Sequence, residues 1–291
     1  MSSWESEDKL VSKEILEKES FTKKPTERAV CRIKIANVSL TRITIADLKK
    51  ELHSDILDGS PEKILTLGNA CTKLDREIER AIKTMFIKEK SLITIRLPSV
   101  AEIGNEDVLV KFEMTLDSFE TFKPVWNWNP NEKYEIALEY KETGVSLFKS
   151  ARYKHAFFMF SKACKILITL EPLSALELAE NLLKNIGDLR IVLYNNMAEC
   201  HLNRKNYEHA ISLCCKVLER DENNVKALYR RGVAYGNLKN FEKALEDFKK
   251  VLIIEPKNSL AKEKFILYNE QYQLENKRYE KIVKRMFGTE K

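Results

Sequence analysis

The sequence has no long apolar run. In its 291 residues, no stretch approaches the roughly 18 consecutive apolar residues that a helix needs to cross a bilayer. Residues 1–28 are polar and charged, and they contain neither the apolar core of a secretory signal nor the Arg- and Ser-rich amphipathic pattern of a transit peptide. We therefore expect a disordered arm over residues 1–28, no membrane partner, and a cytoplasmic location with nuclear entry left open.

Motifs for metal binding and nucleophilic catalysis are missing as well. The 6 cysteines contain no C-x-x-C pair, and the 4 histidines stand neither at zinc-ligand spacing nor in a motif with a nucleophilic Ser or Cys. Four of the cysteines fall in helical apolar patterns, which is typical of small buried side chains in a reducing compartment. We expect no metal, no cofactor and no catalytic residue.

The charge balance is only mildly basic. Lys and Arg number 50 against 44 Asp and Glu, a net charge of +6. This falls short of the dense basic patches that mark nucleic-acid-binding proteins, so we expect no nucleic-acid partner. With 44% hydrophobic residues, the chain is long enough for two ordinary domains, each with its own core.

A repeat occupies the second half of the chain. Each unit has a small residue, an alanine twelve positions later and a further apolar residue four positions beyond that. The three sets are Gly144, Ala156 and Phe160; Ala198, Ala210 and Cys214; Gly232, Ala244 and Phe248. The second and third units are offset by 34 residues, the period of the tetratricopeptide repeat (TPR), a helix hairpin in which small side chains face large ones. We expect three TPR hairpins over residues 134–258.

The first and second units are offset by 54 residues, which indicates a 20-residue insertion around residues 170–190. Pro172 can end the preceding helix, and Ser174 can start another with an apolar stripe through Leu182 and Ile186. The insertion should lengthen one hairpin without breaking the array. After Pro256 we expect a long amphipathic helix in residues 259–291 that caps the solenoid, although its basic end also fits an acidic partner or calmodulin.

The first half is β-rich. Residues 31–40, 91–97 and 108–116 alternate between apolar and polar side chains, while residues 75–86 have helical spacing. This pattern predicts an antiparallel sheet curled over one helix in residues 29–118. The whole chain is therefore expected to be α+β, with a sheet domain, a linker over residues 119–133 and an all-α solenoid.

The first helices of TPR hairpins line one concave groove, so their residues can be assigned to a shared surface. Lys226 and Arg230 stand four residues apart on one helix face, Lys141 and Val145 do the same on another helix, and Asn196 faces inward between them. Three cations and one amide favour a ligand with two neighbouring carboxylates, such as an acidic side chain beside a free chain terminus.

These residues resemble a known site. Lys141, Asn196, Lys226 and Arg230 match the two-carboxylate clamp of co-chaperones that bind the Met-Glu-Glu-Val-Asp tail of the ninety-kilodalton heat-shock protein. Val145 departs from the family, which has Asn or Thr at that position. The resemblance implies a peptide-carboxylate site for this tail, with the seventy-kilodalton chaperone as an open alternative.

The first half resembles a domain that accompanies such repeats. The segments Leu65–Gly68, Leu74–Met85 and Lys88–Lys90 are similar to the FK506-binding (FKBP) type of peptidyl-prolyl isomerase. In that family a Trp-containing linker leads into the repeats, and here Trp126 and Trp128 lie in the linker. The carboxy-terminal half is similar to the FK506-binding-protein-like branch of this immunophilin family.

The FKBP active site is a pocket walled by Tyr, Phe and Trp. Residues 29–118 contain no Tyr or Trp, and their only aromatic side chains besides His53 are Phe86 and Phe112, both on core-facing patterns. By position, the resemblance implies that Ile78 or a neighbour replaces the Trp of the pocket floor. The resemblance thus implies a degenerate domain without isomerase activity, and a non-enzymatic co-chaperone adaptor that links the chaperone to an unknown client protein. An active isomerase tethered to the chaperone and a repeat scaffold for other partners are the alternatives.

Overall fold

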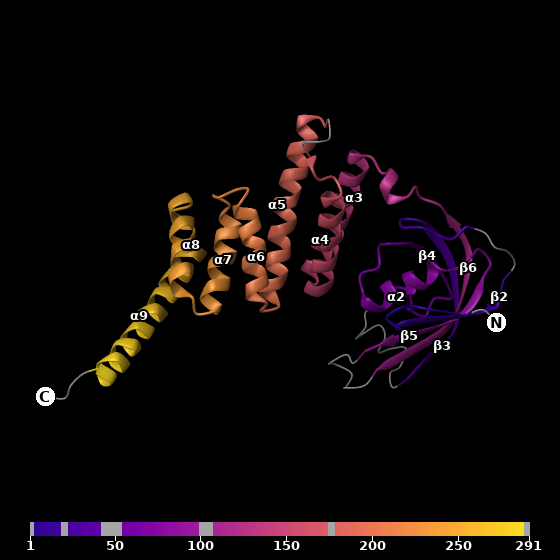
Figure 1. Cartoon of the computed structure of the whole chain (residues 1–291), viewed down its shortest axis with the longest axis horizontal. Coiled ribbons are helices and arrows are strands. Elements are labelled where there is room, and N and C mark those ends of the chain that lie inside the picture. The colour runs from indigo at the N-terminus through magenta and orange to yellow at the C-terminus, as the bar shows by residue number, and fades with distance from the viewer. Residues whose placement is uncertain (1–2, 19–22, 42–53, 99–106, 174–177, 288–291) are drawn as a thin grey trace. The chain divides into compact units, whose positions relative to one another are not determined.

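The structure is a computed structural model that describes residues 3–18, 23–41, 54–98, 107–173 and 178–287 (Figure 1). The chain divides into two compact units, residues 1–128 and 129–291. The first unit is a sheet domain and the second is all helical, which confirms the expected α+β class. In the described residues, no helix combines the length and hydropathy that a membrane span requires.

The first unit contains a six-stranded antiparallel sheet in the order β1-β2-β5-β6-β3-β4. Its strands are β1 (Ser3–Glu5), β2 (Val11–Glu17), β3 (Val30–Leu40), β4 (Glu62–Thr66), β5 (Lys90–Leu97) and β6 (Val108–Glu120). Helix α2 (Lys73–Ile82) contacts β2 and β5. The alternation predicted for residues 108–116 is present, since Val108, Phe112 and Leu116 are completely or almost completely buried.

The disordered arm predicted for residues 1–28 is wrong for the two strands within it. Strand β2 pairs with β5, with Val11 opposite Ile95, and β1 adds to its outer edge. The strand was missed because a charged residue, Lys13, takes a core-facing position in β2 and interrupts the apolar alternation. Its Nζ lies 2.6 Å from the buried Glu89 carboxylate and donates to the Thr84 carbonyl oxygen, so the buried charge is compensated.

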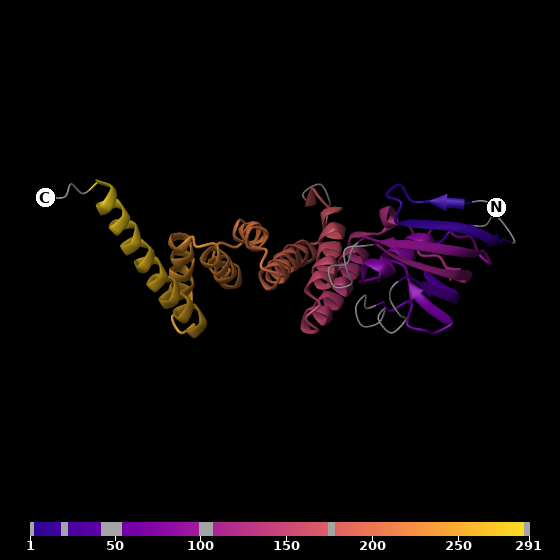
Figure 2. The same cartoon turned by 90° about the horizontal axis from the view of Figure 1, so that it is seen from below.

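The second unit consists of seven helices in the described residues: α3 (Pro130–Lys149), α4 (Tyr153–Ile168), α5 (Glu180–Asn203), α6 (Tyr207–Leu218), α7 (Val225–Asn237), α8 (Phe241–Ile254) and α9 (Ser259–Phe287). Each helix packs on the next, and α3/α4, α5/α6 and α7/α8 form three hairpins. Figure 2 shows these helices in a row.

The small and large positions of the repeat meet across the first and third hairpins as predicted. A Cβ atom on Gly144 would lie 2.5 Å from Cε1 of Phe160, and one on Gly232 would lie 3.0 Å from the Phe248 ring. Both phenylalanines are almost completely buried. Glycine is therefore required for the close approach of the two helices in the first hairpin and favoured in the third.

The insertion lengthens the second hairpin at its start. Helix α4 ends at Ile168, and α5 runs without a break for 24 residues from Glu180. The apolar stripe through Leu182 and Ile186 therefore belongs to the first helix of the second hairpin and not to an additional helix. Ser174, the predicted start, lies outside the described residues. An ion pair between Glu171 and Arg190 ties the connection to α5.

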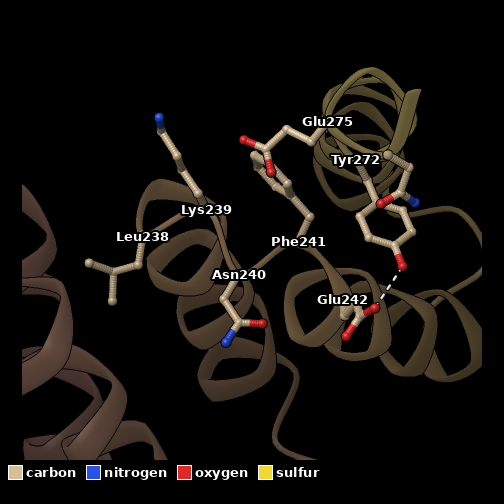
Figure 3. A pocket seen from close by; sticks show the side chains of 8 residues that line it. Leu238, Lys239, Asn240, Phe241, Glu242, Tyr272 and Glu275 are labelled. Carbon is tan, nitrogen blue, oxygen red and sulfur yellow. Dashed lines mark hydrogen bonds between the residues drawn. The ribbon is translucent and has the colours of Figure 1, made fainter. Parts of the chain in front are cut away.

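Helix α9 begins as a cap. Tyr268 is buried and stacks on Phe241 and Phe248, with ring centroids 6.0 and 5.9 Å away. Four residues on, the Tyr272 hydroxyl donates to Glu242 at 2.7 Å (Figure 3). Beyond this point most of the apolar side chains of α9, such as Tyr279, are exposed. The first half of the helix thus covers the last repeat.

The linker is shorter than predicted. Strand β6 extends to Glu120, and α3 begins at Pro130 behind a capping box of Asn129 and Glu132. Between them lies the 3-10 helix η1 (Val125–Asn127). Trp128 is buried, and its Nε1 donates to the Lys123 carbonyl oxygen at 2.8 Å.

Candidate peptide-binding groove

The predicted site residues lie on three neighbouring helices. Helix α5 contacts both α3 and α7, so the first helices of the three hairpins form one continuous layer. Lys141 and Val145 lie on α3, Asn196 lies on α5, and Lys226 and Arg230 lie on α7. The helix assignments made from the sequence are therefore those of the structure.

Three of the predicted site residues, Lys141, Asn196 and Lys226, have side-chain hydrogen-bond donors without a partner among the described residues. Lys226 is exposed, and Lys141 and Asn196 are half-buried. In the part of the chain that the structure describes, none of these three side chains makes a hydrogen bond or ion pair within the protein. Each can therefore bind a ligand oxygen without first breaking a contact.

A hollow lies along α3. Lys141, Glu142, Val145, Ser146 and Lys149 line it. Lys141, Val145 and Lys149 are spaced four residues apart and so share one helix face, which adds a second exposed lysine to the predicted set. Sequence reasoning missed Lys149, although the same four-residue spacing would have found it. Val145 is half-buried and offers no hydrogen bond there.

Arg230 is not free. Its Nε donates to Oε2 of Glu199 on α5, and its Nη1 donates to Oδ1 of Asn195 at 3.1 Å. The Arg230 side chain is 17% exposed and that of Glu199 is 32% exposed, so the pair borders solvent. Asn203 donates to the other Glu199 oxygen at 3.3 Å. Arg230 was predicted as a clamp cation, and its partner Glu199 was not among the predicted site residues.

The polar ladder on α5 has a regular spacing. Asn195, Glu199 and Asn203 stand at four-residue intervals and so lie along one side of the helix. Asn195 also donates to Oδ1 of Asn224 at 3.2 Å, and Asn224 caps α7 by accepting from the Ala227 amide at 3.0 Å. These contacts fix the start of α7, and with it Lys226, against α5.

The sheet domain was expected to have lost an aromatic pocket. Ile78, which the resemblance places at or next to the position of the FKBP pocket-floor Trp, is completely buried in the core together with Phe112. Phe86, also expected in the core, is instead half-buried beneath the ammonium groups of Lys18 and Lys24, which lie 4.0 and 4.7 Å from its ring centroid.

Comparison with known proteins finds the same two parts. Residues 4–121 match the family described as BDBT FKBP like N-terminal, and residues 129–212 match the TPR domain of the Bride of doubletime-like family. Residues 225–258 match a tetratricopeptide repeat. The chain therefore has an FKBP-like amino-terminal domain of the BDBT type followed by TPR domains, which confirms the resemblance to the immunophilin family.

Individual relatives agree with this assignment. The chain is 34% identical to the peptidyl-prolyl cis-trans isomerase FKBP4 of Homo sapiens over 218 residues, which covers 72% of this chain and 46% of the relative. It is 37% identical to the FK506-binding protein-like protein of Mus musculus over 180 residues, covering 61% of this chain and 48% of that protein. The chain spans about half the length of these relatives.

A solved structure supports the fold. The crystal structure of residues 1–211 of CG17282 is similar with a TM-score of 0.56 and 25% sequence identity, covering 72% of this chain and 96% of that chain. The matched part of this chain is longer than either of its two units, so the match includes residues of both. The sheet domain and the helical repeats thus occur together in a related protein.

Proposed function

We propose that this protein is a non-enzymatic co-chaperone adaptor whose TPR groove binds the acidic Met-Glu-Glu-Val-Asp tail of the ninety-kilodalton heat-shock protein. The observation that carries the proposal is the set of unpaired donors on Lys141, Asn196 and Lys226, on three neighbouring helices. A free terminal carboxylate beside an acidic side chain supplies acceptors for all of them. Arg230 supplies the remaining charge.

Physical chemistry favours such a ligand over a generic acidic surface. Hydrogen bonds from charged donors to carboxylates are roughly twice as strong as neutral ones, and fixed helices keep the donors in place before binding. Asn196 donates without charge and so suits a carboxylate that already faces a lysine. Val145 leaves one side of the site without a donor, so the affinity should be lower than that of a complete clamp.

The adaptor role requires a second surface for the client. The exposed apolar side chains on the distal half of α9 and the sheet domain are both available for it. The same groove chemistry accommodates the tail of the seventy-kilodalton chaperone, so the choice between the two belongs to the proposal. A cytoplasmic location, with nuclear entry left open, is part of the same proposal.

A second candidate is a prolyl isomerase, because the relative FKBP4 carries that activity in its name. We propose that the activity is lost here. Catalysis by an FKBP domain needs an aromatic pocket, and a completely buried Ile78 supplies no aromatic wall. A prolyl-isomerisation assay with a Pro-containing peptide tests this: turnover no faster than the uncatalysed rate supports the loss, and clear catalysis contradicts it.

Calorimetry tests the groove directly. The purified chain is titrated with the Met-Glu-Glu-Val-Asp peptide and with its carboxy-amidated form. We expect binding of the free peptide and a large loss on amidation. Lys226→Ala should weaken binding at least fivefold, because about 1 kcal/mol or more is lost with one charged contact.

Lys249→Ala is the matched control, since Lys249 is an exposed lysine on the second helix of the same hairpin. It should bind as the unmodified chain does. Equal affinity for free and amidated peptide would contradict the proposal and would favour a repeat scaffold for partners of another kind.

A further inference from the structure

An acidic residue, Glu199, lies beside one of the predicted clamp cations at the border of the groove. Glu199 lies against Arg230, the one predicted clamp cation that has an internal partner among the described residues. Lys141, Lys226 and Arg230 give three positive charges, and Glu199 reduces their sum to two. A ligand carboxylate that approaches Arg230 therefore meets a fixed negative charge beside its intended partner.

The contact geometry leaves part of Arg230 open. Glu199 takes the Nε donor and Asn195 takes one Nη1 donor, whereas Nη2 has no partner among the described residues. A ligand side chain can therefore reach the guanidinium through Nη2 without displacing Glu199. It then shares Arg230 with a carboxylate that remains in place.

Glu199 is itself held firmly enough to stay. Its two oxygens accept from Arg230 and from Asn203, one turn further along α5. The pair between Arg231, one residue further along α7, and Asp247 on α8 differs because its carboxylate is only 3% exposed. Glu199 is ten times more exposed and borders the groove, so its charge acts on whatever the groove holds.

We infer that Glu199 is a specificity-determining residue, one that shifts the groove away from an acidic last side chain and toward a neutral amide at the carboxy-terminal residue of the ligand. The inference rests on the proposed function. A ligand amide accepts from Nη2 of Arg230 through its oxygen and donates from its nitrogen to the Glu199 carboxylate. A ligand carboxylate can also accept from Nη2, but it has no hydrogen to donate to Glu199 and meets the negative charge of that carboxylate, so it gains less than the amide does.

The variant Glu199→Gln separates charge from position. Glutamine keeps an oxygen that accepts from Arg230 but removes the negative charge. Two peptides are titrated by calorimetry into the full chain and the variant: Met-Glu-Glu-Val-Asp and the same peptide ending in Asn. Glu199→Gln should strengthen binding of the Asp-ending peptide by about two- to fivefold, the range of a partly exposed charge pair. The Asn-ending peptide should change much less.

Glu246→Gln is the matched control, because Glu246 is an exposed glutamate on α8 and the substitution makes the same change in net charge. It should leave the ratio of the two affinities unchanged. If Glu199 merely positions Arg230, Glu199→Gln will leave the ratio unchanged and Glu199→Met will weaken both peptides, and either result overturns the inference. Equal binding of amidated and free peptides overturns the proposed function instead, so the two failures are distinguishable.

Discussion

Arg231 on α7 holds Asp247 on α8 through two parallel hydrogen bonds, with Nε–Oδ2 and Nη2–Oδ1 distances of 2.9 and 2.7 Å. The carboxylate is almost completely buried, and the pair holds the pKa of Arg231 above its usual value. Arg230 precedes Arg231 in the chain but faces the groove and α5. Two adjacent arginines thus have different roles, one within a hairpin and one toward a ligand.

This difference can be measured. Arg231→Ala leaves the buried Asp247 carboxylate unpaired and should lower the free energy of unfolding by about 3 kcal/mol. Arg230→Ala removes a partly exposed pair and should cost about 1 kcal/mol or less. Chemical denaturation followed by far-UV circular dichroism gives both values.

Peptide titration provides the second comparison. Arg230→Ala should weaken binding of the acidic tail, whereas Arg231→Ala should bind normally at temperatures where it is folded. Equal losses of stability in the two variants would contradict the distinction between a structural and a ligand-facing arginine.

The helix crossings depend on glycine at particular positions. In Gly144→Ala the new Cβ would meet the buried Phe160 ring at 2.5 Å, so the first hairpin must open and stability should fall by about 1–3 kcal/mol. Gly187 is also helical, but a Cβ there has no neighbour within 4 Å. Gly187→Ala should therefore stabilise the chain by about 0.5–1 kcal/mol through helix propensity.

Thermal denaturation of the two alanine variants checks the signs. The midpoint should fall for Gly144→Ala and rise for Gly187→Ala relative to the unmodified chain. A rise in both would mean that the small position of the first repeat does not set the helix distance.

The first strands should contribute to the stability of the sheet domain. Lys13→Met removes the cation from a buried ion pair and leaves the Glu89 carboxylate, among the described residues, with only its hydrogen bonds from Ser91 and the Phe86 amide. We expect a loss of about 3 kcal/mol. Lys111→Met is the control, since Lys111 is exposed on β6, and it should change stability by less than about 0.5 kcal/mol.

Hydrogen exchange measured by mass spectrometry shows which strands lose stability in Lys13→Met. The amides of β2 and of its partner β5 should exchange faster in Lys13→Met, while the TPR helices keep their protection. Unchanged protection of β2 and β5 would contradict the role of the ion pair.

The fold was predictable where the spacing of residues along the chain follows directly from how helices or strands pack. The spacing from Gly144 to Phe160 recurs in each repeat, because the same hairpin geometry must place a small residue beside a large one. Strands β1 and β2 were not predictable in this way. The core-facing stripe of β2 includes Lys13, whose burial depends on Glu89, 76 residues further along the chain, and no local pattern reports such a partner.

The candidate site was likewise predictable from the sequence only in part. The four-residue spacing of Lys226 and Arg230 predicts that they share a face of one helix. Whether Arg230 is open or paired depends on how α7 is positioned along α5, because Glu199 and Arg230 are 31 residues apart in the chain. That register is set by packing between helices, for example by the bond from Asn195 to Asn224, and a single sequence does not contain it.

The last prediction concerns acid stability. His201 on α5 is buried beside the Phe157 ring of α4 and the His209 ring of α6, with centroids 4.5 and 5.2 Å away, and Asn206 lies 3.5 Å from its Nδ1. Burial, with smaller contributions from His209 and Arg204, lowers the pKa of His201 to about 4. The unfolded chain binds this proton near pH 6.5, so the folded state holds fewer protons between the two values.

The contribution of His201 to the free energy of unfolding is therefore fully present above pH 6.5. It is lost as the pH falls toward 4, by up to about 3 kcal/mol. Urea denaturation at intervals from pH 7.5 to 4 should show this decline in the unmodified chain. In His201→Gln the group that titrates is removed, so the decline should be shallower by a similar amount although the variant starts from a lower stability. Parallel pH profiles for the two proteins would mean that His201 protonates as readily in the folded chain as in the unfolded one.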